Sequence, residues 1–150
     1  MSDLIVARGL TKSYGATHAL NDATFKVGAG RIVGLIGPNG AGKTTALKAV
    51  LGLARFQGEL SVLGLDPYHQ RHKLMQDVCF IADVAVLPRW IRVHQLINLV
   101  AATHPKFRRD VCEQFLARTD IKRDSRVKEL SKGMVTQLHL ALVMAIDAKL

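Results

Sequence analysis

Short apolar runs separated by turn residues mark the first half of the chain. Residues 4–7, 19–27 and 59–63 are rich in β-forming side chains and predict strands. Residues 31–36 are almost continuously apolar, as in a strand that is buried on both faces of a parallel sheet. Residues 78–82 predict one further strand. The first half is therefore expected to be built around a sheet.

Helical spacing follows a glycine-rich segment and dominates the second half. Apolar residues recur every three or four positions over residues 44–51, and Gly52 supplies a stop. A short basic helix is expected between the last two predicted strands, and longer helices at 93–103, 109–118 and 132–148. Strands and helices alternate, which predicts an α/β fold.

Composition limits the class of protein. The 150 residues suffice for one domain, and 49% hydrophobic with 22% charged residues is typical of a globular chain. The longest apolar stretch, residues 140–146, is far shorter than the ~20 residues of a membrane span. The first residues carry no basic signal region, and Cys79 and Cys112 lack metal-ligand spacing. These features favour a reducing, cytoplasmic setting.

The formal charge of +9 comes largely from basic clusters at residues 71–73, 106–109 and 122–128. A nucleic-acid surface would interleave aromatic residues with these charges, and only Phe107 does so. No direct nucleic-acid partner is therefore expected. The clusters fit a solvated face, or a surface near an anionic membrane leaflet, where each cation contributes about 1 kcal/mol of attraction.

The strongest motif is a phosphate-binding loop of the form G-x-x-x-x-G-K-[ST], between a predicted strand and a predicted helix. It consists of Gly37, Pro38, Asn39, Gly40, Ala41, Gly42, Lys43, Thr44 and Thr45. Its glycines let successive N–H groups and the helix N-terminus point at phosphate oxygens. Lys43 is expected to reach the β- and γ-phosphates, and the Thr44 hydroxyl to ligate Mg²⁺.

The filling of this loop, from Pro38 to Ala41, resembles that of ABC-type ATPases. Upstream, Lys12-Ser13-Tyr14-Gly15 resembles the aromatic loop of that family, which implies that Tyr14 stacks on adenine. The alternative for Tyr14 is an ordinary core or surface position. The resemblance extends from residue 4 to residue 150.

Downstream, Leu130-Ser131-Lys132-Gly133-Met134 resembles the LSGGQ signature of the same family. The resemblance implies that Ser131 and Gly133 contact the ATP held by a second ATP-binding subunit. A helix N-terminus suits an anionic phosphate, whereas the alternative for Ser131 is an ordinary helix N-cap. Lys132 and Met134 depart from the common form.

The family usually carries a glutamine at the position matched by Asp83, where it touches Mg²⁺ and the attacking water. The resemblance therefore assigns Asp83 a catalytic and metal-binding role beside Lys43, with loop capping as the alternative. Trp90 follows in a region that faces the membrane subunit in the family. It is either a docking anchor or a partly buried structural residue.

Hydrolysis in the family also needs an apolar strand ending in Asp (Walker B), a following Glu and a later His. None of these is present: residues 62–66 and 143–147 imitate only the first part. The sequence is accordingly interpreted as a domain truncated before the Walker B strand, inactive by itself.

The resemblance implies a P-loop NTPase (RecA-like) core with an N-terminal antiparallel β layer and a sheet that is incomplete at its C-terminal end. Residues 1–150 would form one partial nucleotide-binding domain, with a helical subdomain at about 84–135. The implied function is an ATP-binding subunit that couples MgATP binding and hydrolysis to transport, with export favoured. It would lie on the cytoplasmic face of the membrane with a permease subunit. The alternatives are an ABC-type ATPase acting on ribosomes or DNA, and an inactive ATP-binding fragment.

Overall fold

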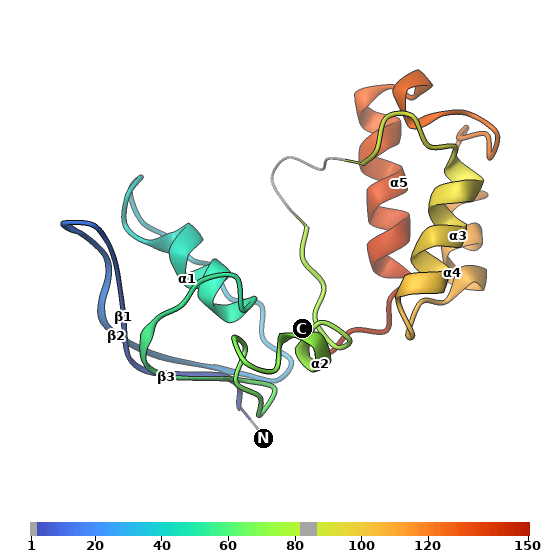
Figure 1. Ribbon diagram of the computed structural model, residues 1–150. Coiled ribbons are helices and arrows are strands. Elements are labelled where there is room, and N and C mark those ends of the chain that lie inside the picture. The colour runs from blue at the N-terminus through green and yellow to red at the C-terminus, as the bar shows by residue number, and fades with distance from the viewer. Residues whose placement is uncertain (1–2, 82–86) are drawn as a thin grey trace. The chain divides into compact units, whose positions relative to one another are not determined.

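The computed structural model describes residues 3–81 and 87–150. The chain forms two compact units, Met1–Met75 and Gln76–Leu150, which are described separately below. Figure 1 labels the elements of both.

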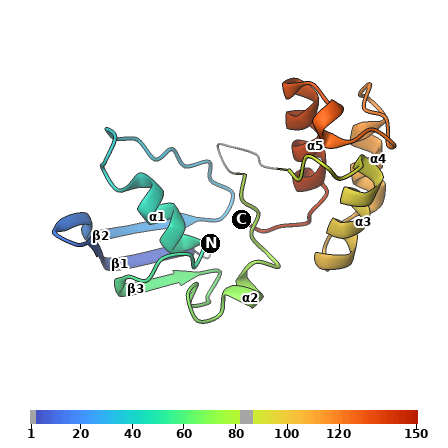
Figure 2. The same cartoon turned by 45° about the horizontal axis from the view of Figure 1, so that its top comes forward.

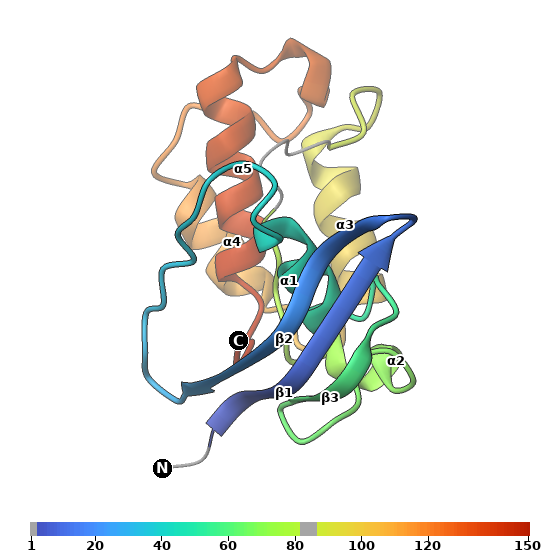
Figure 3. The same cartoon turned by 90° about the vertical axis from the view of Figure 1, so that its left-hand side faces the viewer.

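The first unit is built on an antiparallel sheet of three strands in the order β2-β1-β3. Strands β1 (Asp3–Tyr14) and β2 (Thr17–Gly28) form a long hairpin, and β3 (Gln57–Val62) pairs with the other edge of β1, as Figure 3 shows. The N-terminal antiparallel β layer is thus confirmed, with strands β1 and β2 longer than the apolar runs suggested. Polar residues extend them because the hairpin faces solvent on one side.

Helix α1 (Lys43–Val50) lies over this sheet and contacts β2 (Figure 2). Its buried residues are Ala46, Ala49 and Val50, and the small alanines allow close packing on the strands. A single turn, α2 (Arg71–Leu74), buries Leu74 completely. The two helices confirm the helical spacing at 44–51 and the short basic helix.

Residues 31–36 do not form the predicted strand. Within the described part of the chain, no backbone hydrogen bond joins them to another segment, and the chain runs as a plain trace from β2 toward α1 (Figure 1). Ile32, Val33, Leu35 and Ile36 are all exposed. An apolar run becomes a strand only by pairing, and none of the described residues pairs with this one, so the local preference alone does not suffice.

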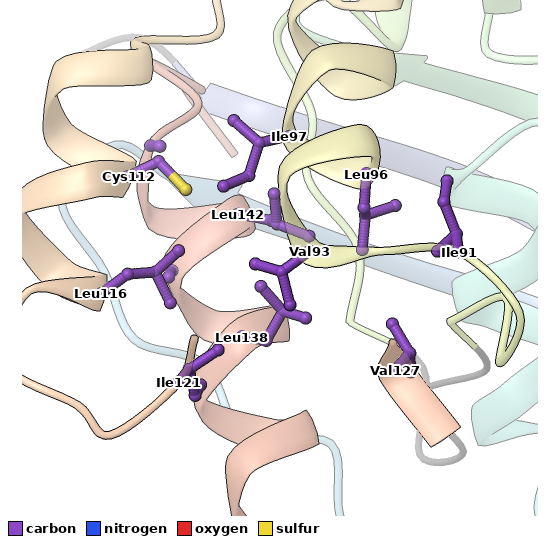
Figure 4. Packing of buried hydrophobic residues seen from close by; sticks show 12 residues of the cluster. Ile91, Val93, Leu96, Ile97, Cys112, Leu116, Ile121, Val127, Leu138 and Leu142 are labelled. Atoms are coloured by element: carbon purple, nitrogen blue, oxygen red, sulfur yellow. The ribbon is translucent and has the colours of Figure 1, made fainter. Parts of the chain in front are cut away.

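The second unit is helical. It contains α3 (Val93–Thr103), α4 (Arg109–Leu116), the 3₁₀ turn η1 (Val127–Glu129) and α5 (Lys132–Met144). Residues from all four elements and the adjoining loops form one apolar cluster (Figure 4). Val93, Ile97, Leu116 and Leu138 are its most buried large members.

Helix α5 ends four residues before the predicted position. The N–H of Arg108 donates to the carbonyl of Ala145 at 2.8 Å, and Ile146 forms an antiparallel bridge with Phe107. These contacts take up the backbone groups after Met144, so the chain turns from helix into an extended segment there. Helix α4 likewise ends at Leu116 instead of residue 118.

Both cysteines are free thiols. Burial and the neighbouring Glu113 carboxylate raise the pKa of Cys112 to about 11. Cys112 therefore stays protonated at neutral pH and acts as a small apolar core residue.

The predicted strand at 78–82 is not a regular strand in its described part, residues 78–81, but pairing begins there. The Leu150 N–H donates to Asp77 O at 3.1 Å, and the Cys79 N–H donates to Leu150 O at 2.8 Å. Two bonds from one residue to the neighbours on either side of Val78 are the pattern of parallel strands. Leu150 thus bonds to the residues on either side of Val78 in the parallel pattern, without forming a strand.

An ion-pair cluster reinforces this pairing. The Asp77 carboxylate accepts a hydrogen bond from the Lys106 ammonium and lies 3.4 Å from the Lys149 ammonium. Its pKa is lowered, first by the bond from Lys106 and then by that from Lys149. The ion pairs thus connect Asp77, which precedes residues 78–81, with Lys149, which precedes Leu150.

We expect Asp77→Asn to lower the stability of the protein near pH 7, with the difference from the parent shrinking as the pH falls. The folded state lowers the pKa of Asp77, so its stabilisation is full above the unfolded value near 4 and is lost as the pH drops through the lower folded value. Thermal unfolding of both proteins across this pH range measures the effect. Asp120→Asn, at an exposed site without an ion pair among the described residues, is the matched control. A stability gap that persists undiminished in acid would contradict the argument.

Candidate functional site

The phosphate-binding loop is an exposed turn that leads into α1. The N–H of Ala41 donates to Pro38 O at 3.2 Å, and the helix starts at Lys43 with Gly42 as its N-cap. No side chain caps the helix, so N–H groups of its first turn remain available to an acceptor. The loop thus offers the donors expected of an anion site.

Gly42 is where the loop touches the sheet. Its φ is +86°, and a Cβ built there would lie 2.0 Å from the carbonyl oxygen of Ala19 in β2. Only glycine fits both the left-handed backbone and this close approach. The second glycine of the motif therefore fixes the start of α1 against β2.

The Lys43 side chain folds back over the loop. Its ammonium donates to Gly37 O at 2.6 Å and to Pro38 O at 2.7 Å. These bonds place the cation at the centre of the loop, where it faces any group that the loop binds.

A hollow of about 320 Å³ opens beside the loop. It is lined by Thr17, Ala19, Asn39, Gly40, Gly42, Lys43, Thr44 and Thr45. Five predicted residues of the motif beyond Lys43 thus share one concave surface with it. Thr17 and Ala19 were missed by the sequence analysis, because neither belongs to a motif. Only the hairpin register, which carries β2 past Gly42, brings them to the hollow.

Tyr14 lies at the end of β1 and pairs with Thr17 in the hairpin register. The Tyr14 ring is 51% exposed, and the Lys12 ammonium lies 5.0 Å from its centroid. The core position considered for Tyr14 is therefore excluded. Its register partner Thr17 lines the hollow, while the stacking role of Tyr14 stays a prediction.

Ser131 is the N-cap of α5, in the second unit. Its hydroxyl accepts a hydrogen bond from the N–H of Met134 at 3.2 Å, and Gly133 is exposed in the first turn. The helix-opening position predicted for this motif is confirmed. The cap bond shows that the N-cap role is real, and it leaves the contact with a second nucleotide as a prediction.

Three further positions were singled out from the sequence: Asp83, Trp90 and Asp66. Asp83 lies outside the described residues. Trp90 is 73% exposed, which excludes a partly buried structural role, while its docking role stays a prediction. Asp66 accepts hydrogen bonds from the N–H groups of Tyr68 and His69 at 2.8 and 2.9 Å, so it is a turn residue, as expected of an imitation motif.

Comparison with known proteins decides the family. The family model described as ABC transporter matches residues 20–150, most of the chain. The chain belongs to the ABC transporter family. It resembles ATP-binding subunits: a solved structure titled as the ATP-binding subunit of an ABC transporter aligns with a TM-score of 0.82 and 25% identity, over 97% of this chain and 63% of that one. A second solved chain, from Pyrococcus furiosus, has 24% identity and a TM-score of 0.77 and supports the same P-loop NTPase fold.

Named relatives of this ABC chain include exporters and importers. The lipopolysaccharide export ATP-binding protein LptB of Haemophilus influenzae is 31% identical over 97% of this chain. The Nod factor export ATP-binding protein I of Rhizobium meliloti is 34% identical over 94%, and the sulfate/thiosulfate import protein CysA of Methylococcus capsulatus is 32% identical over 97%. The chain spans 64% of the first relative and 44% of each of the others. No helix in the described part of this ABC chain is long and apolar enough to cross a bilayer.

We predict that Gly42→Ala destabilises the first unit more than Gly40→Ala. Both glycines have a left-handed backbone, with φ of +86° and +87°, so either substitution costs about 1–3 kcal/mol in strain. Only at Gly42 would the new Cβ collide with Ala19 O, since nothing lies within 4 Å of a Cβ at Gly40. Thermal unfolding of the two variants separates the cost of the backbone strain, which both share, from the cost of the collision with Ala19 O. Equal losses would mean that the loop can move away from β2 without cost.

We also expect Tyr14→Ala to weaken ATP binding by about 1–3 kcal/mol if the exposed ring stacks on the base. Binding of inorganic tripolyphosphate should stay near the parental value, because that ligand has no base. Tyr14→Phe keeps the ring and serves as the control in the same equilibrium titrations. A similar loss for both ligands would assign Tyr14 a structural role.

Proposed function

We propose that the complete protein binds and hydrolyses MgATP as the ATP-binding subunit of an ABC exporter. The observation that carries the proposal is the hollow formed by the phosphate-binding loop and β2, with Lys43 in its lining. The family membership supports ATP as the ligand.

The donors of this hollow fit a triphosphate. The N–H groups at the start of α1 and the Lys43 ammonium bind the phosphate oxygens, and the Thr44 hydroxyl, which also lines the hollow, is a suitable oxygen ligand for Mg²⁺. Mg²⁺, when bound, would neutralise part of the phosphate charge. Tyr14 binds the base end, and Asp83 contributes to the metal and the attacking water.

We further propose that two ATP-binding subunits enclose the nucleotide, with Ser131 and Gly133 of one facing the loop of the other. The exposure of Ser131 and Gly133 at the N-terminus of α5 supports this arrangement, because a helix N-terminus attracts an anionic γ-phosphate. The helical subdomain at about 84–135 binds a permease at the cytoplasmic face of the membrane, and the exposed Trp90 suits that contact.

Export is the proposed direction. Two of the relatives named above are export subunits, and the form of the signature motif, with Lys132 and Met134, also favours it. The import protein among the relatives represents the opposite direction. The Walker B Asp, the following Glu and the later His of the family are not found within residues 1–150, so we propose that these 150 residues bind nucleotide without turning it over.

Lys43→Ala tests the proposal. We expect the substitution to remove most MgATP affinity and all permease-stimulated ATP hydrolysis by the complete protein, reconstituted in vesicles with its permease. The reason is that this ammonium is the only side-chain cation of the loop. Lys48→Ala, on the exposed face of the same helix, is the control and should behave like the parent.

Affinity for MgATP within about twofold of the parent would overturn the loop assignment. If the parent binds nucleotide but the permease does not stimulate its ATP hydrolysis, the loop assignment stands and the transport role is refuted.

A further inference from the structure

Two adjoining hollows open in the first unit and contain no residue of the phosphate-binding loop. The larger, of about 390 Å³, is lined by Arg55, Phe56, Gly58, Asp66, Tyr68 and His69. The smaller, of about 250 Å³, is lined by Thr11, Lys12, Ser13, Arg55, Phe56 and Gln57. Arg55 and Phe56 belong to both. We call the pair the Arg55 hollows.

The Arg55 hollows are positively charged. Lys12 and Arg55 face the smaller one, and its lining contains no acidic residue. Asp66 is the acidic residue of the larger hollow, but its carboxylate is already occupied. It accepts bonds from two backbone N–H groups and contacts the His69 ring nitrogen at 3.0 Å. The carboxylate keeps its negative charge, but two cations, Lys12 and Arg55, stand against this one anion, so the lining is cationic in balance.

Arg55 is held in one orientation by Tyr68. Its Nε donates to the Tyr68 hydroxyl at 2.5 Å, and the guanidinium carbon lies 5.0 Å from the centroid of the same ring. The two terminal nitrogens have no hydrogen-bond partner among the described residues. A guanidinium held on an aromatic ring with both terminal nitrogens available is suited to bind an oxyanion through two parallel bonds.

The remaining walls are defined by strand pairing. Thr11 and Gln57 are register partners of β1 and β3, so the two sides of the smaller hollow are fixed by the sheet. Phe56, half-buried between the two hollows, adds a flat apolar surface next to the cations. A volume near 390 Å³ falls in the usual range for small-molecule sites.

We propose that the Arg55 hollows bind a small molecule in which an oxyanion, a phosphate or a carboxylate, adjoins a flat apolar group. The oxyanion binds Arg55 and Lys12, and the apolar group packs on Phe56. This second site contains no residue of the phosphate-binding loop and does not depend on the proposed transport role, although its Lys12 ammonium also lies 5.0 Å from the centroid of the Tyr14 ring.

The test titrates the complete protein carrying Lys43→Ala, so that the phosphate-binding loop does not compete for the probe. Phenyl phosphate, benzoate and neutral benzyl alcohol are the probes, and backbone amide NMR shifts of Arg55, Phe56 and Tyr68 are the readout. We expect saturable binding of at least one anionic probe with Kd near or below about 1 mM, weakened by added salt. The tighter of the two anions identifies phosphate or carboxylate as the preferred group.

Arg55→Gln should weaken binding of the preferred anion about fivefold or more. The affinity of Arg55→Lys should lie between those of Arg55→Gln and the parent, because lysine keeps the charge but not the paired donors. Arg8→Gln is the matched control, since it removes the same charge from an exposed arginine of the same unit, 3.4 Å from Glu59. Should Arg55→Gln fail to fold, Lys12→Gln decides, because Lys12 makes no bond to Tyr68.

Three outcomes would overturn the proposal. The first is the absence of saturable binding up to about 10 mM of either anion. The second is equal binding of benzyl alcohol, which would remove the role of the oxyanion. The third is an equal effect of Arg8→Gln, or no effect of Lys12→Gln where that variant decides, which would reduce the attraction to general charge.

Discussion

The close approach of Gly42 to the carbonyl of Ala19 is the contact on which the candidate site depends. It fixes the N-cap of α1 to β2, and so aligns the available N–H groups, Lys43 and Thr44 with the strand. Any side chain at position 42 would push the loop away from the sheet. The motif is usually explained by what its glycines offer to a phosphate, but in this chain the second glycine is also required for packing.

Strand pairing is the constraint that separates the well-formed parts of the structure from the rest. Strands β1, β2 and β3 satisfy one another and support a regular sheet. Residues 31–36 have a strong strand preference and no partner among the described residues, and their apolar side chains remain in solvent. Leu150 makes backbone hydrogen bonds to Asp77 and Cys79, beside the ion pairs of Asp77 with Lys106 and Lys149. Preference without a ladder does not yield a strand.

The sequence predicted most of this organisation because most of it is local. Helix α3 agrees with its predicted bounds, since apolar spacing and flanking residues are read directly from neighbouring positions. The phosphate-binding loop was found because its spacing encodes a backbone shape. Thr17 and Ala19 could not be found in this way, since a hairpin register brings them to the loop from about 20 residues away. The end of α5 was also missed, because a distant carbonyl contact with Arg108 sets it.

The bonds from Lys43 to Gly37 O and Pro38 O have a consequence for phosphate binding. The ammonium is already satisfied by acceptors of its own loop, so an incoming phosphate exchanges one set of acceptors for another. Such an exchange lowers the net gain from this cation, because the bonds given up are themselves charge-assisted. The same carbonyls can accept the ammonium again whenever a phosphate leaves the loop. Any phosphate at this loop must therefore compete with the loop's own backbone for Lys43.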